Sequence, residues 1–383
     1  MNSSTRTAAD LIPRQGNLGP DPSAICALVR PFEAIAYLYA NLETLGEQQH
    51  ALRWRSIANE FTDLEAPALA VNSLAVRYAK AEPTPATLAL FSAADGTMLH
   101  EQWLSDTKMQ HRTGYAAPPS VVPLLGWEQE RPPYVLVVVD RAGADLTAST
   151  GGSAVARTWK VTGPDDEIER NAPGGWSQPR YRRRAEDSWR HNAKYVAGEV
   201  TKAVAGVHAQ VIVMSGDVRA VQLLANELPR NEDLLVRRIS GSRTSDGSQV
   251  HRDDQVAWEL KAAAAQQTRS LLDLFHSHLN PGGLSVEGTA LTVAALSAGR
   301  VATLLVTDDL TDHRDLWFGE SATDIFLDHE SALASKRPVR RGRLADVAIR
   351  AALLSGAQVR VIPATETGAP EEGIGAVGRF GAQ

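Results

Sequence analysis

The stretch YVLVVVD at residues 134–140 decides the fold class of this chain. Its nearly continuous, valine-rich apolar content predicts a strand that is buried on both faces, as in a sheet covered by helices. A second run of this kind, VIVMSGD at 211–217, precedes a helical pattern at 218–227 and a short edge strand at 235–239. Strands that alternate with helices in this order predict an α/β layer.

The segment between the two buried strands combines flexibility with positive charge. The turn RAGAD at 141–145 leads into a return strand, and residues 158–162 predict a further strand. The sequence GGWSQ at 174–178 follows, and its two glycines free the backbone from the usual restriction on φ. We therefore expect a mobile loop that carries one planar amide, Gln178, ahead of a helix from about Arg182 to Val204.

The helix after the glycine loop has a basic face and an apolar face. Between Arg180 and Lys194 there are six basic and two acidic residues, a local charge of +4 in a chain whose net charge is −6. Guanidinium groups at helical spacing can neutralise successive phosphates and stack on bases, which favours an RNA-binding role. The alternative is a solvated face with pairing inside the helix to Glu186 and Asp187. The spacing places these residues on the apolar face: Ala185, Trp189, Ala193, Val196, Val200 and Ala203.

Length and composition limit the remaining possibilities. A chain of 383 residues exceeds one ordinary core, so we expect two or three domains. A hydrophobic fraction of 43% is typical of a soluble globular protein. The one cysteine, Cys26, can form neither an internal disulfide nor a cysteine-based metal site, which favours a cytoplasmic location. No apolar run reaches the length of a membrane span, so we expect no membrane partner.

The pattern divides the chain into an arm and three domains, α/β in class and α+β overall. Residues 1–22 lack an apolar segment and predict a disordered arm. We expect a first domain at 23–120 and a middle domain at 130–245 built as a mixed sheet with helices. The third domain, 250–383, begins with a linking helix at 251–279. Its later segments predict a small α/β sandwich, with helices at 289–298 and 344–354 and strands at 301–307, 358–363 and 373–380.

Few residues outside the glycine loop suggest chemistry. Asp308, Asp309, Asp312 and His313 follow a buried strand, where sites occur in α/β proteins, but a solvated loop is the competing interpretation. The stretch HRDD at 251–254 fits an acidic helix start better than a metal site. The chain has no P-loop, HExxH or GxSxG motif, so we predict neither a metal nor a cofactor.

The order of the segments resembles one known family. The sequences YVLVVVDRAGADLTAS at 134–149, GGWSQPRYRRRAEDSWRHNAKY at 174–195, VIVMSGDV at 211–218 and GIGAVGRF at 373–380 are similar to bacterial relatives of the archaeal and eukaryotic class-one release factors and of Pelota. The resemblance covers the chain from about residue 120 onward. It implies an RNase H-like middle domain that projects its loop into the peptidyl-transferase centre. It also implies a first domain at the decoding region and a third domain that meets a translational GTPase.

The loop departs from the release-factor pattern. Release factors carry Gly-Gly-Gln, whereas Trp176 and Ser177 separate Gly175 from Gln178 here. Pelota and the bacterial hibernation factor Balon, to which the chain is similar, lack that loop and occupy the ribosomal A site without hydrolysis. The resemblance therefore implies a non-enzymatic hibernation factor of stress or stationary phase. Its partners would be the 70S ribosome and elongation factor Tu or another translational GTPase. The residues expected to contact rRNA are Gly174, Gly175, Trp176, Ser177, Gln178, Arg180, Arg182, Arg183, Arg184, Arg190 and Lys194.

Two alternatives stay open. The spacing from Gly175 to Gln178 is also similar to that of peptidyl-tRNA-cleaving relatives, so the chain could be a peptidyl-tRNA hydrolase that releases or rescues stalled ribosomes. A neutral amide is no strong base, so Gln178 would then orient the attacking water or the terminal ribose hydroxyl. A non-ribosomal scaffold is the third interpretation, and it predicts negligible RNA binding.

Overall fold

The protein is described by a computed structural model that divides into two compact units. The described residues are 22–42, 47–82, 86–105, 109–152, 156–162, 178–229, 234–241, 243, 249–309 and 311–379. The first unit contains Glu130–Gln266, and the second joins Pro22–Gln129 with Gln267–Gln383. The expected first and third domains therefore share one unit. The division into three domains stays a prediction, and the expected arm lies almost wholly outside the described residues.

The first unit is built on a five-stranded mixed sheet, which confirms the predicted α/β class. The strand order is β7-β6-β5-β8-β9, in which β5, β8 and β9 are parallel and β6 and β7 are antiparallel to their neighbours. The bounds are β5 Tyr134–Val139, β6 Gly143–Ser149, β7 Arg157–Thr162, β8 Val211–Gly216 and β9 Leu235–Arg238.

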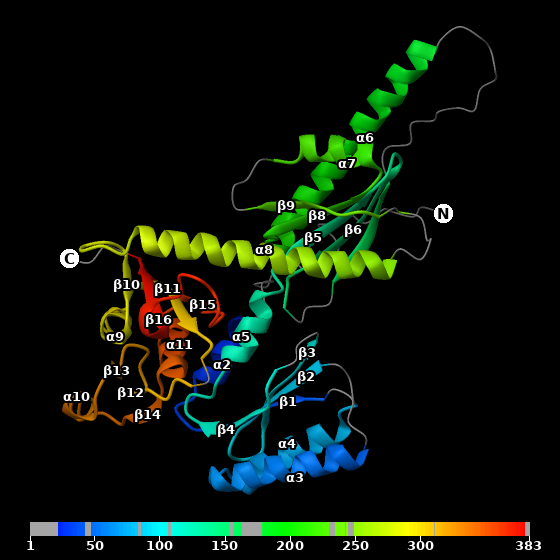
Figure 1. The fold of residues 1–383 in the computed structure, drawn as a ribbon. Coiled ribbons are helices and arrows are strands. Elements are labelled where there is room, and N and C mark those ends of the chain that lie inside the picture. Colours follow the sequence, from blue (N-terminus) through cyan, green and yellow to red (C-terminus); the bar gives the residue numbers. More distant parts are fainter. Residues whose placement is uncertain are drawn as a thin grey trace. The chain divides into compact units, whose positions relative to one another are not determined.

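Helices cover both faces of this sheet (Figure 1). Val135, Val137 and Val139 pack with α6 (Gln178–Val207) and α7 (Val218–Glu227), whereas Leu136 and Val138 pack with α8 (Gln249–Ser277). The alternation along β5 explains why its sequence is apolar without interruption. The strand β8 ends at Gly216, whose φ is +123° and where a Cβ would lie 1.9 Å from the carbonyl oxygen of Val139, so only glycine fits.

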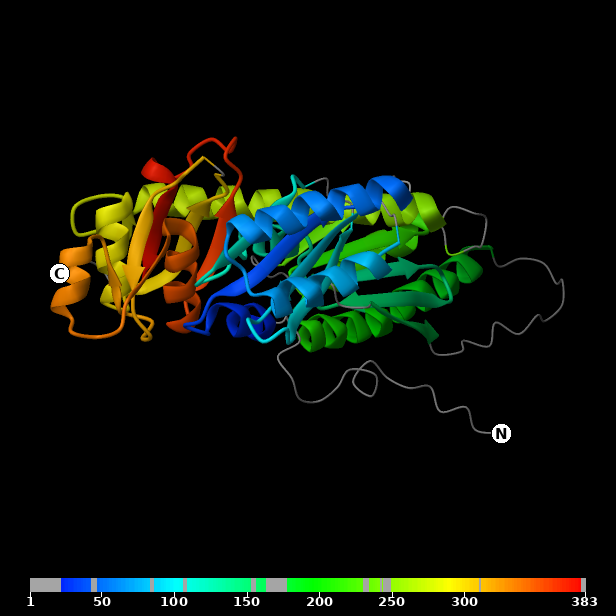
Figure 2. The same ribbon diagram turned by 90° about the horizontal axis from the view of Figure 1, so that it is seen from below.

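The N-terminal part of the second unit is an antiparallel sheet backed by two helices. The strand order is β3-β2-β1-β4, and α3 and α4 lie together against one face (Figure 2). Ile57, Phe61 and Leu74 on these helices are fully buried against the strands. The bounds are α2 Pro22–Val29, β1 Ile35–Asn41, α3 Glu47–Asp63, α4 Ala68–Lys80, β2 Ala86–Ser92, β3 Met98–Ser105, β4 Arg112–Ala116 and α5 Val122–Gln129.

The C-terminal part of the second unit has a four-stranded sheet of order β10-β16-β11-β15, in which β11 and β15 are parallel. The long polar connection after β11 folds into a separate three-stranded sheet of order β13-β12-β14 with the short helix α10, which the sequence pattern did not predict. The bounds are β10 Ser285–Glu287, α9 Thr289–Ser297, β11 Val301–Thr307, β12 Asp315–Phe318, β13 Ile325–Phe326, α10 His329–Ala334, β14 Arg340–Arg343, α11 Leu344–Leu354, β15 Gln358–Ile362, η1 Glu371–Gly373 and β16 Ile374–Gly378.

Direct contacts join the two parts of the second unit. The Gln129 side chain donates to the carbonyl of Val359 at 2.8 Å and accepts from the N–H of Val361 at 3.0 Å, so it extends the edge of the β15 strand. Arg112 on β4 forms an ion pair with Asp308 after β11, at 3.1 Å. These contacts and a shared apolar core explain why chain segments far apart in sequence form one unit.

Candidate functional site

The predicted RNA-binding residues lie in α6, most of them near its start, and in the four residues before it. The helix starts at Gln178, earlier than the expected start near Arg182, and Pro179 suits this first turn because its missing N–H needs no partner there. Gly174–Ser177 lie outside the described residues, as do the side chains of 178–188. Of the eleven residues expected to contact rRNA, Arg190 and Lys194 have described side chains, and both are exposed.

Among the described side chains of α6, which begin at Trp189, the buried ones lie in the second half of the helix, against the sheet. Ala193, Val196, Val200 and Ala203 are buried, which confirms that part of the predicted apolar face. The half that runs from Gln178 to about residue 191 extends past the end of the sheet (Figure 1). At 1.5 Å per residue this half is about 20 Å long. The helix therefore carries its own start, at Gln178, away from the body of the unit.

Two contacts secure α6 where it leaves the sheet. The buried Asn192 directs its amide Nδ2 to the carbonyls of Asp140 and Arg141, at 3.3 and 3.4 Å, in the turn between β5 and β6. One turn earlier, the ring of Trp189 lies 5.9 Å from the guanidinium carbon of Arg219 on α7. The first contact lies just after the carboxyl end of β5, and the second involves α7, which follows β8, the parallel neighbour of β5.

The β5–β6 turn is itself organised by Asp140. Its Oδ1 accepts from the N–H groups of Ala142 and Gly143, at 2.7 and 2.9 Å, and from Arg243 at 3.1 Å. Arg243 also donates to Asp145 at 2.9 Å. Burial lowers the pKa of Arg243, but the two carboxylates raise it by more, so the guanidinium stays charged. Both carboxylates therefore form ion pairs, and no His, Cys, Asp and Glu cluster with three possible metal ligands occurs in the described residues.

A second polar site lies in the second unit, at the carboxyl ends of the parallel strands β11 and β15. It is a cavity of about 470 Å³ in the position where α/β sheets commonly bind ligands. Its wall combines the loop after β11, the first turn of α11 and the turn before β16. The residues around it are Thr307, Asp309, Thr311, Asp312, Arg314, Leu344, Ala345, Ala364, Ala369, Pro370, Glu372 and Gly373.

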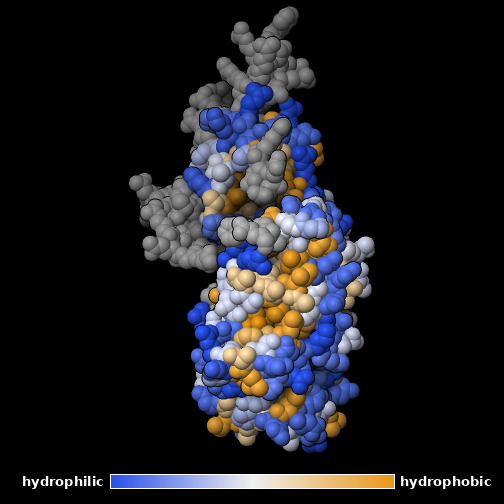
Figure 3. Space-filling model, turned by 90° about the vertical axis from the view of Figure 1, so that its left-hand side faces the viewer, coloured by the Kyte–Doolittle hydropathy of each residue, from blue (hydrophilic) through white to orange (hydrophobic). Residues whose placement is uncertain are grey.

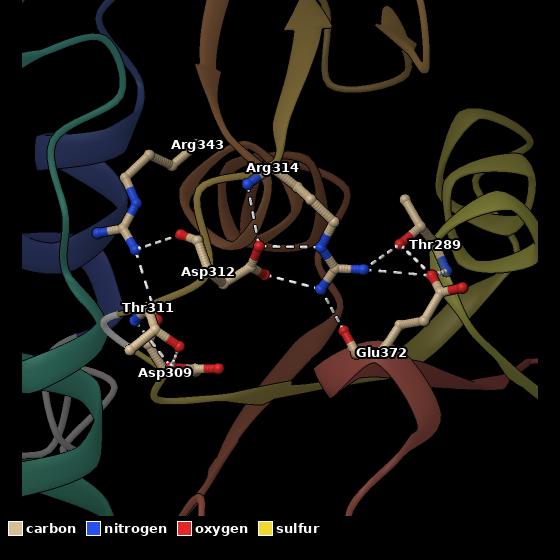
Figure 4. Close-up of polar contacts among 7 residues, drawn as sticks. All are labelled: Thr289, Asp309, Thr311, Asp312, Arg314, Arg343 and Glu372. Atoms are coloured by element: carbon tan, nitrogen blue, oxygen red, sulfur yellow. Dashed lines mark hydrogen bonds and ion pairs between the residues drawn. The ribbon is translucent and has the colours of Figure 1, made fainter.

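Arg314 holds this site together (Figure 4). Its Nε and Nη2 donate to the two carboxylate oxygens of Asp312, at 2.9 and 2.7 Å. Its Nη1 donates to Thr289 Oγ1 at 2.9 Å and to Glu372 Oε2 at 3.2 Å, and Nη2 also reaches the carbonyl of Glu372. All five N–H donors of the guanidinium are thus used. The arginine clasps the start of α9, the loop after β11 and the turn before β16.

Hydrogen bonds at this site favour the ionised form of its carboxylates. The hydrogen bond from Arg314 lowers the pKa of Asp312, and hydrogen bonds from Thr289 lower the pKa of Glu372. Thr311 does the same for Asp309. Glu372 has a φ of +55°, a left-handed conformation that is unusual outside glycine, and its bonds to Thr289 and Arg314 hold it there. Bound in this way, the polar groups mainly hold the three segments together.

The acidic residues predicted after β11 therefore divide between two structural roles. Asp309 and Asp312 belong to the cavity wall, whereas Asp308 pairs with Arg112 of the N-terminal part and His313 is exposed. The sequence did not indicate Arg314 or Glu372, because 58 residues separate them. It also did not indicate Asp346 on α11, whose pKa burial raises to about 6.

Comparison with known families finds a match that covers most of the first unit. Residues 133–280 match a family described as bacterial archaeo-eukaryotic release factor family 2. This segment holds β5 to β9 and α6 to α8, so it includes the projecting helix. The predicted resemblance to bacterial relatives of archaeal and eukaryotic release factors is confirmed there.

Whole-chain similarities are more distant. An uncharacterized protein of Mycobacterium tuberculosis is 26% identical over 366 residues, which cover 92% of this chain and 94% of that protein. The archaeal termination factor aRF1 is 14% identical, with coverage of 98% and 99% and a TM-score of 0.22. Pelota of Archaeoglobus fulgidus is 12% identical, with coverage of 97% and 94% and a TM-score of 0.36. TM-scores of this size do not establish a common arrangement of the whole chain.

Proposed function

We propose, from the match of residues 133–280 to a release-factor family of bacteria, that this chain is a ribosome-binding translation factor. It occupies the A site of the 70S ribosome with its glycine loop toward the peptidyl-transferase centre. In this proposal it is a hibernation factor of stress or stationary phase that acts in the cytoplasm. The observation that carries the proposal is the projecting half of α6, which extends the loop-bearing end of the helix beyond the sheet.

The charge on α6 supports an RNA partner. Arg190 and Lys194 are four residues apart, exposed and close to the point where the helix leaves the sheet. Four more arginines precede them in sequence, between 180 and 184. Cations along one helix contact successive phosphates without reading the base sequence, which suits rRNA. The spacer Trp176-Ser177 in the loop favours occupation of the site over hydrolysis.

A hydrophobic surface supports a protein partner for the second unit. Figure 3 views the side that carries α9 and α10 and shows hydrophobic side chains gathered there. Leu291, Leu327 and Leu333 in this region are 60%, 45% and 58% exposed. Exposed apolar side chains that gather on one surface are typical of protein interfaces rather than of nucleic-acid interfaces. We propose elongation factor Tu or another translational GTPase as the occupant.

Ribosome association in stationary phase tests the proposal. The wild-type chain should sediment with 70S ribosomes from stationary-phase lysate and inhibit A-site tRNA binding. The double variant Arg190→Glu, Lys194→Glu should lose most of this association, because each phosphate contact that is removed weakens binding. The loss of these contacts should also lower the salt dependence of the binding that remains. Lys336→Glu reverses one exposed charge of the second unit; it serves as the control for a charge reversal away from α6 and should behave as wild type. Absence of the wild-type chain from ribosomes contradicts the proposal.

A peptidyl-tRNA hydrolase is the second candidate, and the position of Gln178 favours it. Gln178 is the first residue of α6, and the first turn of a helix has unpaired N–H groups that can stabilise a developing oxyanion. This function predicts release of the nascent chain from stalled ribosome complexes, and Gln178→Ala should slow that release by about 100-fold or more. Equal release by both proteins would remove Gln178 from catalysis.

A further inference from the structure

The point where α6 leaves the sheet is surrounded by a connected polar network. The network links three segments of the first unit: α6 through Asn192, the β5–β6 turn through Asp140, and the segment after β9 through Arg243. Asn192 is 6% exposed, so its amide works in a largely dry environment. Hydrogen bonds that are shielded from water hold geometry more firmly than solvated ones.

Hydrogen bonds within the turn and to Arg243 fix the position of the β5–β6 turn. Asp140 accepts two hydrogen bonds from its own turn, so the direction of its carboxylate is fixed before Arg243 binds. Arg243 then spans Asp140, in the turn just after β5, and Asp145 on β6. A planar guanidinium that bonds two carboxylates has little rotational freedom. The carbonyls of Asp140 and Arg141, which receive the Asn192 amide, are therefore presented by a rigid turn.

A small tilt at this point has a large effect at the start of α6. From Asn192 to Gln178 the helix runs 14 residues, about 21 Å at 1.5 Å per residue. A lever of this length converts a tilt of about 6° into a displacement of about 2 Å at its end. Displacements of this size matter for a group that must fit a tightly packed RNA site.

We infer that Asn192 and Arg243, acting through the β5–β6 turn, are positioning residues that set the direction of the projecting half of α6. The inference rests on the proposed function for its biological meaning, but not for its physical test. It assigns Asp140 and Asp145 a role in this brace rather than in metal binding or catalysis. Neither Asn192 nor Arg243 needs to touch the ribosome.

Distances between spin labels within the first unit test the inference directly. One label is placed on the projecting half of α6 by Glu186→Cys and the other on β7 by Lys160→Cys, in a Cys26→Ser background of the full chain. With the brace intact, the distance distribution should be narrow. Asn192→Ala and Arg243→Ala should each at least double its width. Arg243→Lys, which keeps the charge but can pair with only one carboxylate at a time, should give an intermediate width.

The control breaks an ion pair of the same unit that lies away from α6. Arg237→Ala removes the contact between Arg237 on β9 and Glu259 on α8, at 3.4 Å, and should leave the width unchanged. Unchanged widths in both Asn192→Ala and Arg243→Ala overturn the inference. If either alanine variant does not fold, Arg243→Lys decides, since a width equal to that of the intact brace also overturns it.

Sedimentation of the same variants with ribosomes separates this inference from the proposed function. A broadened distribution together with weakened ribosome binding supports both. A broadened distribution with no ribosome binding by the wild-type chain supports the brace and overturns the proposed function. A narrow distribution in the variants overturns the brace, whatever the binding shows.

Discussion

The helices α6 and α11 pack on similar sheets but use their lengths differently. α11 has eleven residues, and eight of them are buried. α6 has thirty, and its buried residues all lie between Asn192 and Val207, among the side chains described from Trp189 onward. The shorter helix is almost wholly part of a core. The longer one uses a core only to anchor a part that extends past it.

The two helices also place charge differently. α11 buries Asp346 and Arg350, which are 3% and 2% exposed, whereas Arg190 and Lys194 of α6 are exposed. A buried charge needs fixed partners, so it ties its helix to specific neighbours. A charge at the surface does not tie its helix to the core in this way. The comparison teaches that a helix packed on a sheet can either be buried almost wholly in the core or use the core to hold an end that extends beyond it.

Removal of Arg350 should produce the largest effect. Arg350 donates to the carbonyls of Gly319 and Glu320, at 3.2 and 2.9 Å, and its guanidinium carbon lies 5.1 Å from the ring of Phe318. Arg350→Ala removes these contacts and leaves a cavity, so the free energy of unfolding should fall by about 3 kcal/mol.

Urea denaturation of the full chain measures this loss. The matched control is Arg337→Ala, which breaks the pair of the 63% exposed Arg337 with Asp324 and should cost less than about 1 kcal/mol. Equal losses in the two variants would mean that burial of Arg350 contributes nothing.

Neutralising Asp346 should have the next largest effect, with the opposite sign. Burial raises the pKa of Asp346 from 3.8 to about 6. Between these values the folded state holds more protons than the unfolded state, so stability falls as pH rises through this window and the loss is complete above it. Asp346→Asn should therefore raise the free energy of unfolding at pH 7.5 by about 2 kcal/mol and change it little at pH 4.

Denaturation at both pH values checks the sign of this effect. The groups that face Asp346 are Tyr37 and Tyr39 on β1, Arg112 on β4, Ser120, Asp308 and Arg343. Burial raises the pKa of both tyrosines, so neither of them changes its charge state between pH 4 and 7.5. A variant that is destabilised at pH 7.5 would show that Asp346 is ionised and well compensated.

The clasp of Arg314 should give a smaller change. Arg314→Gln breaks the paired bonds to Asp312 and the bonds to Thr289 and Glu372, and the melting temperature at pH 7 should fall by about 2 to 4 °C. Because the pKa of Asp312 is lowered by Arg314, this stabilisation is present above the ordinary aspartate pKa and is lost as pH falls through the lowered value. The difference from wild type should therefore shrink below about pH 4.

A single exposed ion pair in the same region provides the control for the clasp. Arg341→Gln breaks one pair, to Asp315 at 2.7 Å, with Arg341 64% exposed. Differential scanning calorimetry should show a shift of less than about 1 °C. A shift as large as that of Arg314→Gln would mean that the five-donor arrangement adds nothing.

Substitution on the exposed face of α6 should leave stability almost unchanged. Arg190→Ala should alter the free energy of unfolding by less than about 0.5 kcal/mol. In binding to ribosomal RNA, however, it should reduce the slope of log affinity against log salt by about 1. Filter binding over a range of salt concentrations measures the slope. An unchanged slope would show that Arg190 contacts no phosphate.

The apolar pattern predicted much of the local structure. The valine-rich runs indicated β5 and β8, and the spacing on α6 indicated its buried face from Ala193 onward. These features depend on neighbours within a few residues. The three-stranded sheet after β11 was missed because its strands are two to four residues long and polar on one side.

The polar sites could not be predicted for a different reason. Arg314 and Glu372 are 58 residues apart, and Arg112 and Asp308 are 196 apart, so only the folded chain brings them together. The grouping of 22–129 with 267–383 depends on such contacts as well. The rRNA-contacting role predicted for Gly174–Ser177 stays a prediction, because these residues lie outside the described part of the chain.

The split of the second unit along the sequence has a consequence for synthesis. A chain made from its N-terminus has residues 22–129 available long before residues 267–383 exist, whereas Glu130–Gln266 is continuous. The first unit can therefore finish folding during translation, and the second must wait for its C-terminal half. Contacts such as Arg112–Asp308, which close a loop of about two hundred residues, make this a slow step with a high entropic barrier. During that delay the apolar face of Tyr37 and Phe91 is uncovered, so chaperone protection matters most for the earliest part of the nascent chain.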